Sequence, residues 1–259
     1  MFKRIVLAVL FLGAVCFADD WKREYRVGAS PYLQVETNDA SIEVHGTNGA
    51  SISVNVTAKG YSIGPDGVRV SERQDGDQVY VQVKIPHWNF WFNFTDRSVH
   101  IEVWAPQQTK IKLDSSDGSL RLDGTRGEAR LNTSDGSIRV NNFDGVLVAR
   151  SADGSIEATG RFDGLDLNTS DGHVTAEVRA GSHLSSNWSI RTADGSITLR
   201  LPEDLAVDLD AWTSDGSVSV DLPMLVQGTQ GRNRVHGRLN GGGPLLEVRT
   251  SDGSVHISR

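Results

Sequence analysis

A ten-residue motif that recurs through the second half of the chain limits the fold more than any other feature of this sequence. Its clearest copy runs from Leu131 to Val140, and close copies begin at Leu113, Ala149, Leu167, Ile190, Ala211 and Val248. Apolar and polar residues alternate at both ends of the motif, which predicts a strand on either side. The Asp-Gly pair between them predicts a turn, because Gly accepts positive φ and Asp can bond to its own turn backbone.

The spacing of the motif predicts how the strands stack. Its Asp recurs every 18 residues over four copies and then at intervals of 23, 21 and 37, at Asp117, Asp135, Asp153, Asp171, Asp194, Asp215 and Asp252. A chain that returns to the same register every 18 residues can stack its coils about 4.8 Å apart, as neighbouring strands do. We therefore predict an all-β fold: a two-sheeted, single-chain β-solenoid (β-helix) with about 18 residues per coil. Crossover chirality makes a right-handed coil the default.

The first 18 residues have the composition of a secretory signal peptide. Two basic residues precede an apolar run from Ile5 to Val15, and Ala18 is the small residue at the expected cleavage edge. A membrane anchor is the weaker interpretation, because this run falls well short of the roughly 20 apolar residues that a spanning helix needs. A lipoprotein would need a small residue before Cys16, where Val15 stands. We predict an extracytoplasmic protein: periplasmic, at the cell surface or secreted.

Net charge limits the class of partner. The formal charge is −7, and removal of the signal would make it −9, because two of the 26 basic residues would be lost and all 33 acidic residues kept. An acidic chain argues against a nucleic-acid partner and against a general attraction to anionic lipid. The single Cys lies in the signal, so no disulfide is expected in the mature chain. No second apolar stretch of spanning length follows, so we expect no transmembrane segment after cleavage.

The remaining chain divides by its regularity. We assign 1–18 to the signal peptide, 19–31 to a linker or N-terminal cap and 32–259 to the β-solenoid, with irregular coils over 32–105 and Ser-Asp-Gly-Ser repeats over 106–259. Extra residues lengthen the return half of the later coils, at 179–187, 202–204 and 222–246. Ligand-binding loops and tolerated surface insertions both explain them.

The repeated Asp residues raise the question of a cation site. Coils stacked in register would bring their carboxylates about 4.8 Å apart, where like charges repel by roughly 0.9 kcal/mol even in water. The interpretation that we favour is that each carboxylate accepts N–H bonds from its own turn. The alternative is a row of calcium sites, but one Asp per turn does not supply the six or more oxygen ligands of a hard cation. We predict no metal and no cofactor.

An aromatic stretch within 86–95 is the candidate contact region, at Trp88, Phe90, Trp91, Phe92 and Phe94. One interpretation is packing, in which the Phe side chains cover one side of the early coils. The other is an exposed platform for a sugar ring, a lipid surface or another protein. Because strand alternation turns Trp91 away from the Phe residues, we expect Trp88 or Trp91 to be exposed.

A second candidate for binding is the segment 228–243, where basic residues alternate on one face of a predicted strand, at Arg232, Arg234, His236 and Arg238. It could bind an anion, although its Gly run lacks the Lys-Ser/Thr of a phosphate-binding loop. We favour a hairpin whose charges protect the edge of the sheet from association.

Signatures of catalysis are absent from the sequence. It has no G-x-S-x-G turn, no thiol in the mature chain and no His pair at metal-ligand spacing. The set that comes closest to glycoside chemistry is Arg121, Asp123, Arg139 and Glu157, which is more simply explained as cross-strand charge pairs.

The recurring Thr-Ser-Asp-Gly-Ser turns, the Gly-rich insert before Leu246–Val255 and the exported context resemble the bacterial putative-adhesin family of exported β-strand-repeat proteins, a domain of unknown function. The resemblance covers about residues 32–259 and implies an extracytoplasmic solenoid with no assigned reaction. Ala40, which replaces the turn Gly in a fainter copy at Val35, and the aromatic insert depart from the repeat.

We therefore expect a non-enzymatic, exported cell-envelope or surface protein that acts as an adhesion or binding scaffold. Its partner is unknown, and a cell-surface glycan, an envelope component or another protein would each fit. The alternative from another class is a polysaccharide-processing β-helix enzyme, because solenoids can hold an extended glycan along a sheet.

Overall fold

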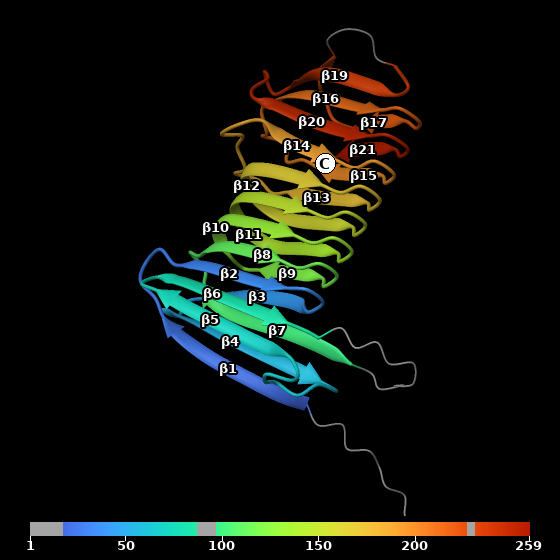
Figure 1. Ribbon diagram of the computed structural model, residues 1–259. Helices are drawn as coiled ribbons and strands as arrows, with labels where there is room; N and C mark the ends of the chain where they lie inside the picture. The colour runs from blue at the N-terminus through green and yellow to red at the C-terminus, as the bar shows by residue number, and fades with distance from the viewer. Residues whose placement is uncertain (1–17, 87–96, 227–230) are drawn as a thin grey trace, which may run out of the picture.

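The computed structural model describes residues 18–86, 97–226 and 231–259, and these residues form an all-β protein (Figure 1). No helix that could span a membrane is found among them. The prediction of an all-β fold is confirmed. The strands are β1 (Ala18–Arg26), β2 (Tyr32–Thr37), β3 (Ser41–Thr47), β4 (Ser51–Lys59), β5 (Arg69–Asp75), β6 (Gln78–Lys84), β7 (Ser98–Pro106), β8 (Lys110–Asp114), β9 (Leu120–Asp123), β10 (Arg126–Asn132), β11 (Ile138–Arg150), β12 (Ile156–Asn168), β13 (Val174–Val178), β14 (Trp188–Arg191), β15 (Ile197–Arg200), β16 (Val207–Thr213), β17 (Val218–Val220), β18 (Leu225–Val226), β19 (Arg234–Leu239), β20 (Leu245–Thr250) and β21 (Val255–Ser258).

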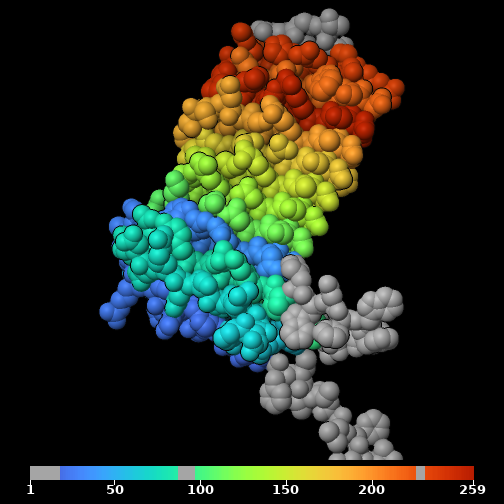
Figure 2. Space-filling view, in the orientation of Figure 1, coloured from blue at the N-terminus to red at the C-terminus, as the bar shows by residue number. Residues whose placement is uncertain are grey.

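The strands pair in two rows that run along the molecule (Figure 1), and the molecule is elongated (Figure 2). The first row is ordered β5, β6, β2, β8, β10, β11, β12, β14, β20, β16, β19 and β18. The second row is ordered β1, β4, β7, β3, β9, β11, β12, β13, β15, β21 and β17. Strands β11 and β12 are long enough to enter both rows, so hydrogen bonding joins all strands into one 21-stranded sheet.

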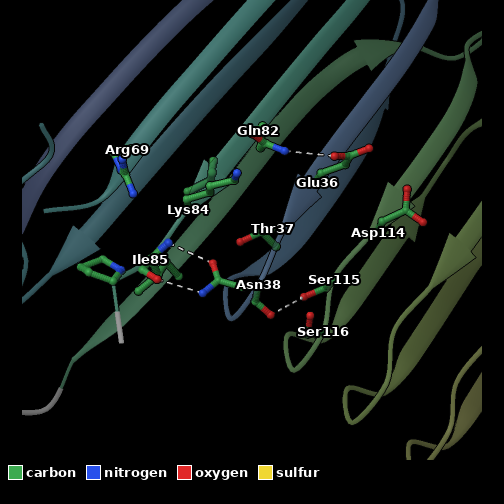
Figure 3. Close-up of a pocket in the computed structure, with 12 residues that line it drawn as sticks. Glu36, Thr37, Asn38, Arg69, Gln82, Lys84, Ile85, Asp114, Ser115 and Ser116 are labelled. Carbon is green, nitrogen blue, oxygen red and sulfur yellow. Dashed lines mark hydrogen bonds between the residues drawn. The ribbon is translucent and has the colours of Figure 1, made fainter. Parts of the chain in front are cut away.

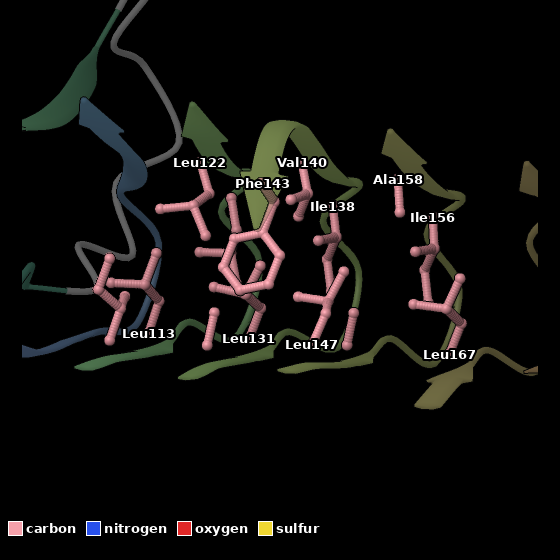
Figure 4. Packing of buried hydrophobic residues seen from close by; sticks show 14 of the residues in the cluster. Leu113, Leu122, Leu131, Ile138, Val140, Phe143, Leu147, Ile156, Ala158 and Leu167 are labelled. Atoms are coloured by element: carbon pink, nitrogen blue, oxygen red, sulfur yellow. The ribbon is translucent and has the colours of Figure 1, made fainter. Parts of the chain in front are cut away.

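Pairing in the middle of both rows is parallel and keeps the 18-residue register. Ile138 lies between Leu120 and Ile156 in the second row. The same offset places Leu131 between Leu113 and Ala149 in the first row. Figure 4 shows the side chains of these apolar positions converging between the rows, where they are almost fully buried. The register therefore keeps one core continuous from coil to coil.

The Asp-Gly turns stack by backbone hydrogen bonds. The N–H groups of Ser134 and Asp135 both donate to the carbonyl oxygen of Ser116, at 2.8 and 3.0 Å. A Cβ on Gly136 would lie 2.2 Å from the carbonyl oxygen of Gly118, the equivalent Gly of the preceding coil. The expectation that positive φ explains these Gly residues is wrong, because none of the seven turn Gly has a positive φ. Close stacking of backbone explains them instead.

The Thr or Ser that precedes each turn supplies a second link between coils. The buried hydroxyl of Thr169 donates to the carbonyl oxygens of Ala152 and Gly154, at 3.1 and 2.8 Å. The hydroxyls at the equivalent positions also donate to two carbonyl oxygens each, at Thr133, Ser151, Thr192, Thr213 and Thr250. The Thr and Gly of the motif are therefore explained by their contacts with the neighbouring coil, which hold the turns in a stack.

One coil near each end of the chain is inserted between strands that are distant in the sequence. Strands β2 and β3 lie between β6–β7 and β8–β9. At the other end, β20 and β21 lie between β14–β15 and β16–β17. The turn at Asp252 therefore stacks between those at Asp194 and Asp215, which accounts for the irregular interval of 37 residues.

Antiparallel strands cover the two tips of the stack. At one tip, β5 pairs with β6, and β4 and β1 follow β7. At the other, β19 pairs with β16 and is itself paired over two residues with β18. Within 19–31, assigned above to a linker or cap, residues up to Arg26 belong to the edge strand β1, whose Tyr25 is buried. A tip covered by antiparallel hairpins cannot extend the parallel register, which ends the stack.

Candidate functional site

A cavity at the N-terminal end of the molecule has a volume of about 590 Å³ and opens on the outward face of the first row. It lies where β6, β2 and β8 end and β5 begins (Figure 3). Arg69 and Lys84 lie at one side, and Ser115 and Ser116, from the turn after β8, lie at the other. Residues far apart in the sequence meet here because the β2–β3 coil is inserted between later strands.

One amide side chain, that of Asn38, fixes the backbone at Ile85 beside this cavity. Asn38 donates to the carbonyl oxygen of Ile85 and accepts from its N–H, both at 2.9 Å. In the other coils of the first row, the turn after the strand makes backbone hydrogen bonds with the turn of the neighbouring coil. Asn38 therefore fixes the end of β6 in place of a stacked turn.

A second cavity of about 270 Å³ adjoins the first along β2, β5 and β6. The two share Glu36 and Gln82, and the second extends to Arg73 and Tyr80. We call the two cavities together the N-terminal groove. Its side chains project from the outward positions of regular strands; β2, β6 and β8 are paired on both sides, whereas β5 is an edge strand paired with β6.

A chain of hydrogen bonds orders the polar groups of the groove. The hydroxyl of Tyr32 donates to Gln34 at 3.0 Å, and the amide of Gln34 donates to Glu36 at 2.5 Å. The other oxygen of Glu36 accepts from the amide of Gln82 at 3.2 Å. Both carboxylate oxygens of Glu36 are thus engaged by amide donors, one from its own strand and one from β6.

Two tyrosines border the chain of polar groups. The rings of Tyr32 and Tyr80 are 5.8 Å apart and tilted by 58°. The guanidinium of Arg73 lies over the Tyr80 ring at 4.5 Å, a cation–π contact. Partial burial raises the pKa of Tyr32 above its ordinary value, so its hydroxyl stays protonated and can donate.

The aromatic stretch predicted as the contact region, Trp88, Phe90, Trp91, Phe92 and Phe94, lies outside the described residues. The residue that precedes this part of the chain, Pro86, lines the larger cavity. The residue that follows it, Arg97, places its guanidinium 5.2 Å from the Tyr61 ring. Exposure of Trp88 or Trp91 stays a prediction.

The seven repeated Asp residues are exposed and have no side-chain hydrogen bond or ion pair within the part of the chain that the structure describes. The interpretation that each accepts N–H bonds from its own turn is therefore wrong. Those N–H groups donate to the neighbouring coil, as described for Ser134 and Asp135. Among the described residues, no group of three His, Cys, Asp or Glu could hold a metal ion.

The basic segment before the last coil forms β19, with Arg232 just ahead of it. Arg234 pairs with Asp210 at 3.1 Å and Arg238 with Asp208 at 3.5 Å, while His236 lies 4.0 Å from Asp210. Its charges are matched by the carboxylates of β16, and the strand covers the C-terminal tip. This arrangement agrees with an edge-protecting hairpin.

The set considered for glycoside chemistry lies on the outward face of the second row. Arg139 contacts Glu157 at 2.8 Å on the next strand, as a cross-strand pair. Arg121 contacts Glu43 at 3.4 Å, and Asp123 accepts from Asn142 at 3.0 Å instead of pairing with Arg121. A cavity of about 290 Å³ is lined by Arg121, Arg139 and Glu157 of this set and also by Glu43 and His100.

The residues of the N-terminal groove were not identified from the sequence. Arg69, Lys84 and Gln82 lie in the irregular early strands, and Glu36 and Asn38 lie in and just after the strand that is inserted among them. No motif joins these positions. The one available signal was the absence of an Asp-Gly turn after the strand that ends at Lys84.

The family model of Toastrack DUF4097 matches residues 92–258. The chain belongs to this family. A Toastrack domain of unknown function agrees with the resemblance to the putative-adhesin family. The match begins after the groove strands β2, β5 and β6, so these residues lie outside the matched range.

Several solved structures are similar to the Toastrack chain at low identity. A putative adhesin from Bacteroides fragilis is 13% identical and covers 92% of this chain and 96% of its own, with a TM-score of 0.46. A putative cell adhesion protein from Clostridium sporogenes is 10% identical and covers 93% and 99%, with a TM-score of 0.39. A putative lipid binding protein from Parabacteroides distasonis is 13% identical and covers 93% and 97%, with a TM-score of 0.36. No curated protein matches the chain significantly.

Proposed function

We propose that this Toastrack protein is a non-enzymatic, extracytoplasmic binding scaffold that holds a saccharide in its N-terminal groove. The scaffold is a right-handed, two-sheeted β-solenoid of about 18 residues per coil, carried outside the cytoplasm by the signal sequence at 1–18. A stack of hydrogen-bonded coils suits this role, because it presents side chains at fixed spacing along a face.

The observation that carries the proposal is the composition of the groove. Sugar rings offer apolar C–H faces and hydroxyl edges, so they are matched by aromatic rings beside fixed hydrogen-bonding groups. Tyr80, which lines the second cavity, supplies a ring, and the ring of Tyr32 lies 5.8 Å from it, outside the residues that line the two cavities. Gln34, Glu36 and Gln82 supply donors and acceptors whose directions are set by their mutual hydrogen bonds. The combined cavities lie in the size range of ligand sites.

Binding of the mature protein to a glycan array, followed by calorimetry with the oligosaccharides that are retained, tests this function. Tyr80→Ala and Gln82→Ala should each weaken saccharide binding about tenfold, because each removes a direct contact worth about 1–2 kcal/mol. The matched control is Thr175→Ala, an outward residue on β13 far from the groove. Retention of no saccharide, or equal binding by all three variants, would contradict the proposal.

The aromatic stretch offers a second test of the contact region. If Trp88 and Trp91 contact the ligand, their joint replacement by Ser weakens attachment to glycans or cells while the thermal unfolding temperature is nearly unchanged. A large fall in the unfolding temperature with unchanged binding would assign the stretch to the core.

The alternative function, a polysaccharide-processing enzyme, is favoured by the cavity over Arg121, Arg139 and Glu157. Release of reducing ends from any polysaccharide, abolished by Glu157→Gln, would establish this activity and replace the scaffold proposal. Unchanged glycan after incubation with the protein would support the scaffold.

A further inference from the structure

Two cations in the larger cavity of the groove have no ion-pair partner among the residues that the structure describes. Arg69 and Lys84 are directly opposite each other on the antiparallel strands β5 and β6, and both line the cavity. Directly opposite residues project from the same face of a sheet. Both side chains are exposed, and within the described residues neither makes an ion pair or a side-chain hydrogen bond.

Most cations of this face have a carboxylate partner, and Arg73 and Arg126 are further exceptions among the described residues. Farther along the first row, a carboxylate partner lies beside each of Lys110, Lys112, Arg130, Arg150, Arg191, Arg234, Arg238 and Arg249. The difference is not explained by a lack of carboxylates, because Glu36 and Asp114 line the same cavity as Arg69 and Lys84.

These two carboxylates are engaged elsewhere. Glu36 accepts from Gln34 and Gln82, as described above. Asp114 accepts from Asn132 at 2.9 Å and contacts the ammonium of Lys112 at 3.1 Å, which raises the pKa of Lys112. The positive charge of Arg69 and Lys84 is therefore left to a ligand, in a protein whose net charge is negative.

We propose that the larger cavity binds the anionic substituent of an acidic saccharide, a carboxylate or a phosphate, through Arg69 and Lys84. This inference rests on the proposed function and names its substrate class. The planar guanidinium of Arg69 suits two parallel bonds to either oxyanion, and the Lys84 ammonium adds a mobile point charge beside it. The hydroxyl of Ser116, on the opposite side of the cavity, can donate to the sugar.

A matched pair of probes separates the contribution of the charge to binding from the contribution of the sugar. Oligogalacturonate and its fully methyl-esterified form have the same sugar backbone and differ in the carboxylate, and a poly(glycerol phosphate) oligomer supplies phosphate. Affinity of the full mature protein for each is measured by calorimetry at low and physiological salt. The variants are Arg69→Gln, Lys84→Gln and the double variant. The control is Arg150→Gln, which removes a paired cation of the same row outside the groove.

The expected result is that the parent binds a charged probe at least tenfold more tightly than the methyl ester. The double variant should lose this preference, and the control should keep it. Higher salt should reduce only the charged-probe affinity. Because neither cation has a partner within the described residues, the unfolding temperatures should be unchanged.

The probes separate the sources of the anion. Loss in the double variant of oligogalacturonate binding assigns a uronate carboxylate. Loss of poly(glycerol phosphate) binding alone would assign the two cations to a phosphate polymer without sugar and would overturn the acidic saccharide as their ligand. Equal binding of the charged and esterified saccharides, unaffected by the variants, would overturn the inference and leave the saccharide function standing. A lack of binding to every saccharide on the array and to all three probes would overturn both.

Discussion

At the residue scale, the repeat is explained by contacts between coils. The turn Gly leaves room for the carbonyl group of the turn below, and the Thr hydroxyl bonds to two carbonyl oxygens of that turn. Both requirements come from coils about 4.8 Å apart, a spacing at which a Cβ or an unsatisfied carbonyl would be costly. The Asp meets no such requirement among the described residues, since its side chain has no partner there.

Gly154→Ala tests the stacking explanation. Its Cβ would lie 2.0 Å from the carbonyl oxygen of Gly136, and backbone cannot rotate away as a side chain could. We expect the free energy of unfolding to fall by about 3 kcal/mol, measured by urea denaturation. The matched control is Gly49→Ala, where the nearest atom is a side-chain oxygen at 3.4 Å, and the change should stay within about 0.5 kcal/mol. Equal, small effects of the two substitutions would contradict this account.

At the element scale, the order of strands in space differs from their order in the chain at both ends. The last coil, β20–β21, is the link between the main stack and the strands β16–β19, because β16 and β17 pair in parallel only with β20 and β21. The segment that contains β16–β19 follows β15 in the chain and ends before β20, where the chain rejoins the main stack; we call this segment the excursion. Loss of the excursion and loss of the last coil should therefore have different consequences.

A pair of deletions tests this link. Deletion of 203–242 leaves Leu246 seven residues after Leu199, the same spacing as from Leu122 to Ala129, so β20–β21 can still stack on β14–β15. We expect this variant to remain folded and resistant to limited proteolysis. Deletion of 245–259 removes the parallel partners of β16 and β17, and protease should then cut the chain beyond Leu201. Mass spectrometry of the fragments measures both, and cutting of both variants in the main stack would contradict the assigned role of the last coil.

At the scale of the whole molecule, the stacked turns align seven exposed Asp residues along one edge of an acidic protein. Like charges about 4.8 Å apart repel, and no described group offsets this repulsion. The folded stack should therefore be less stable at low ionic strength, where screening is weak.

Asp153→Asn measures this repulsion. In low salt it should raise the free energy of unfolding by a few tenths of a kcal/mol. This gain should vanish near 0.5 M salt, because the screening length becomes shorter as the salt concentration rises. Asp66→Asn, at an exposed Asp in a separate turn outside the stacked Asp row, is the control and should change little. Destabilisation by Asp153→Asn would show instead that the carboxylate has a stabilising partner, such as a cation or its own turn.

The sequence by itself determined the parts of the protein that depend on local period. An 18-residue repeat with alternating apolar positions, seen at Leu113, Leu131 and Ile138, was enough to predict all-β structure and buried positions. The reason is that parallel pairing repeats the same contacts in each coil, so each copy of the motif has the residues that make these contacts.

Only the tertiary structure decided which coil lies against which, and with that the candidate site. Insertion of β2–β3 and β20–β21 depends on pairing between segments far apart in the chain, and a local period holds no record of it. The groove follows from that insertion, because it brings Asn38 against Ile85 and Glu36 against Gln82. Its unpaired Arg69 and Lys84 were indistinguishable in sequence from ordinary surface cations, since a missing counter-charge is a property of the surrounding space.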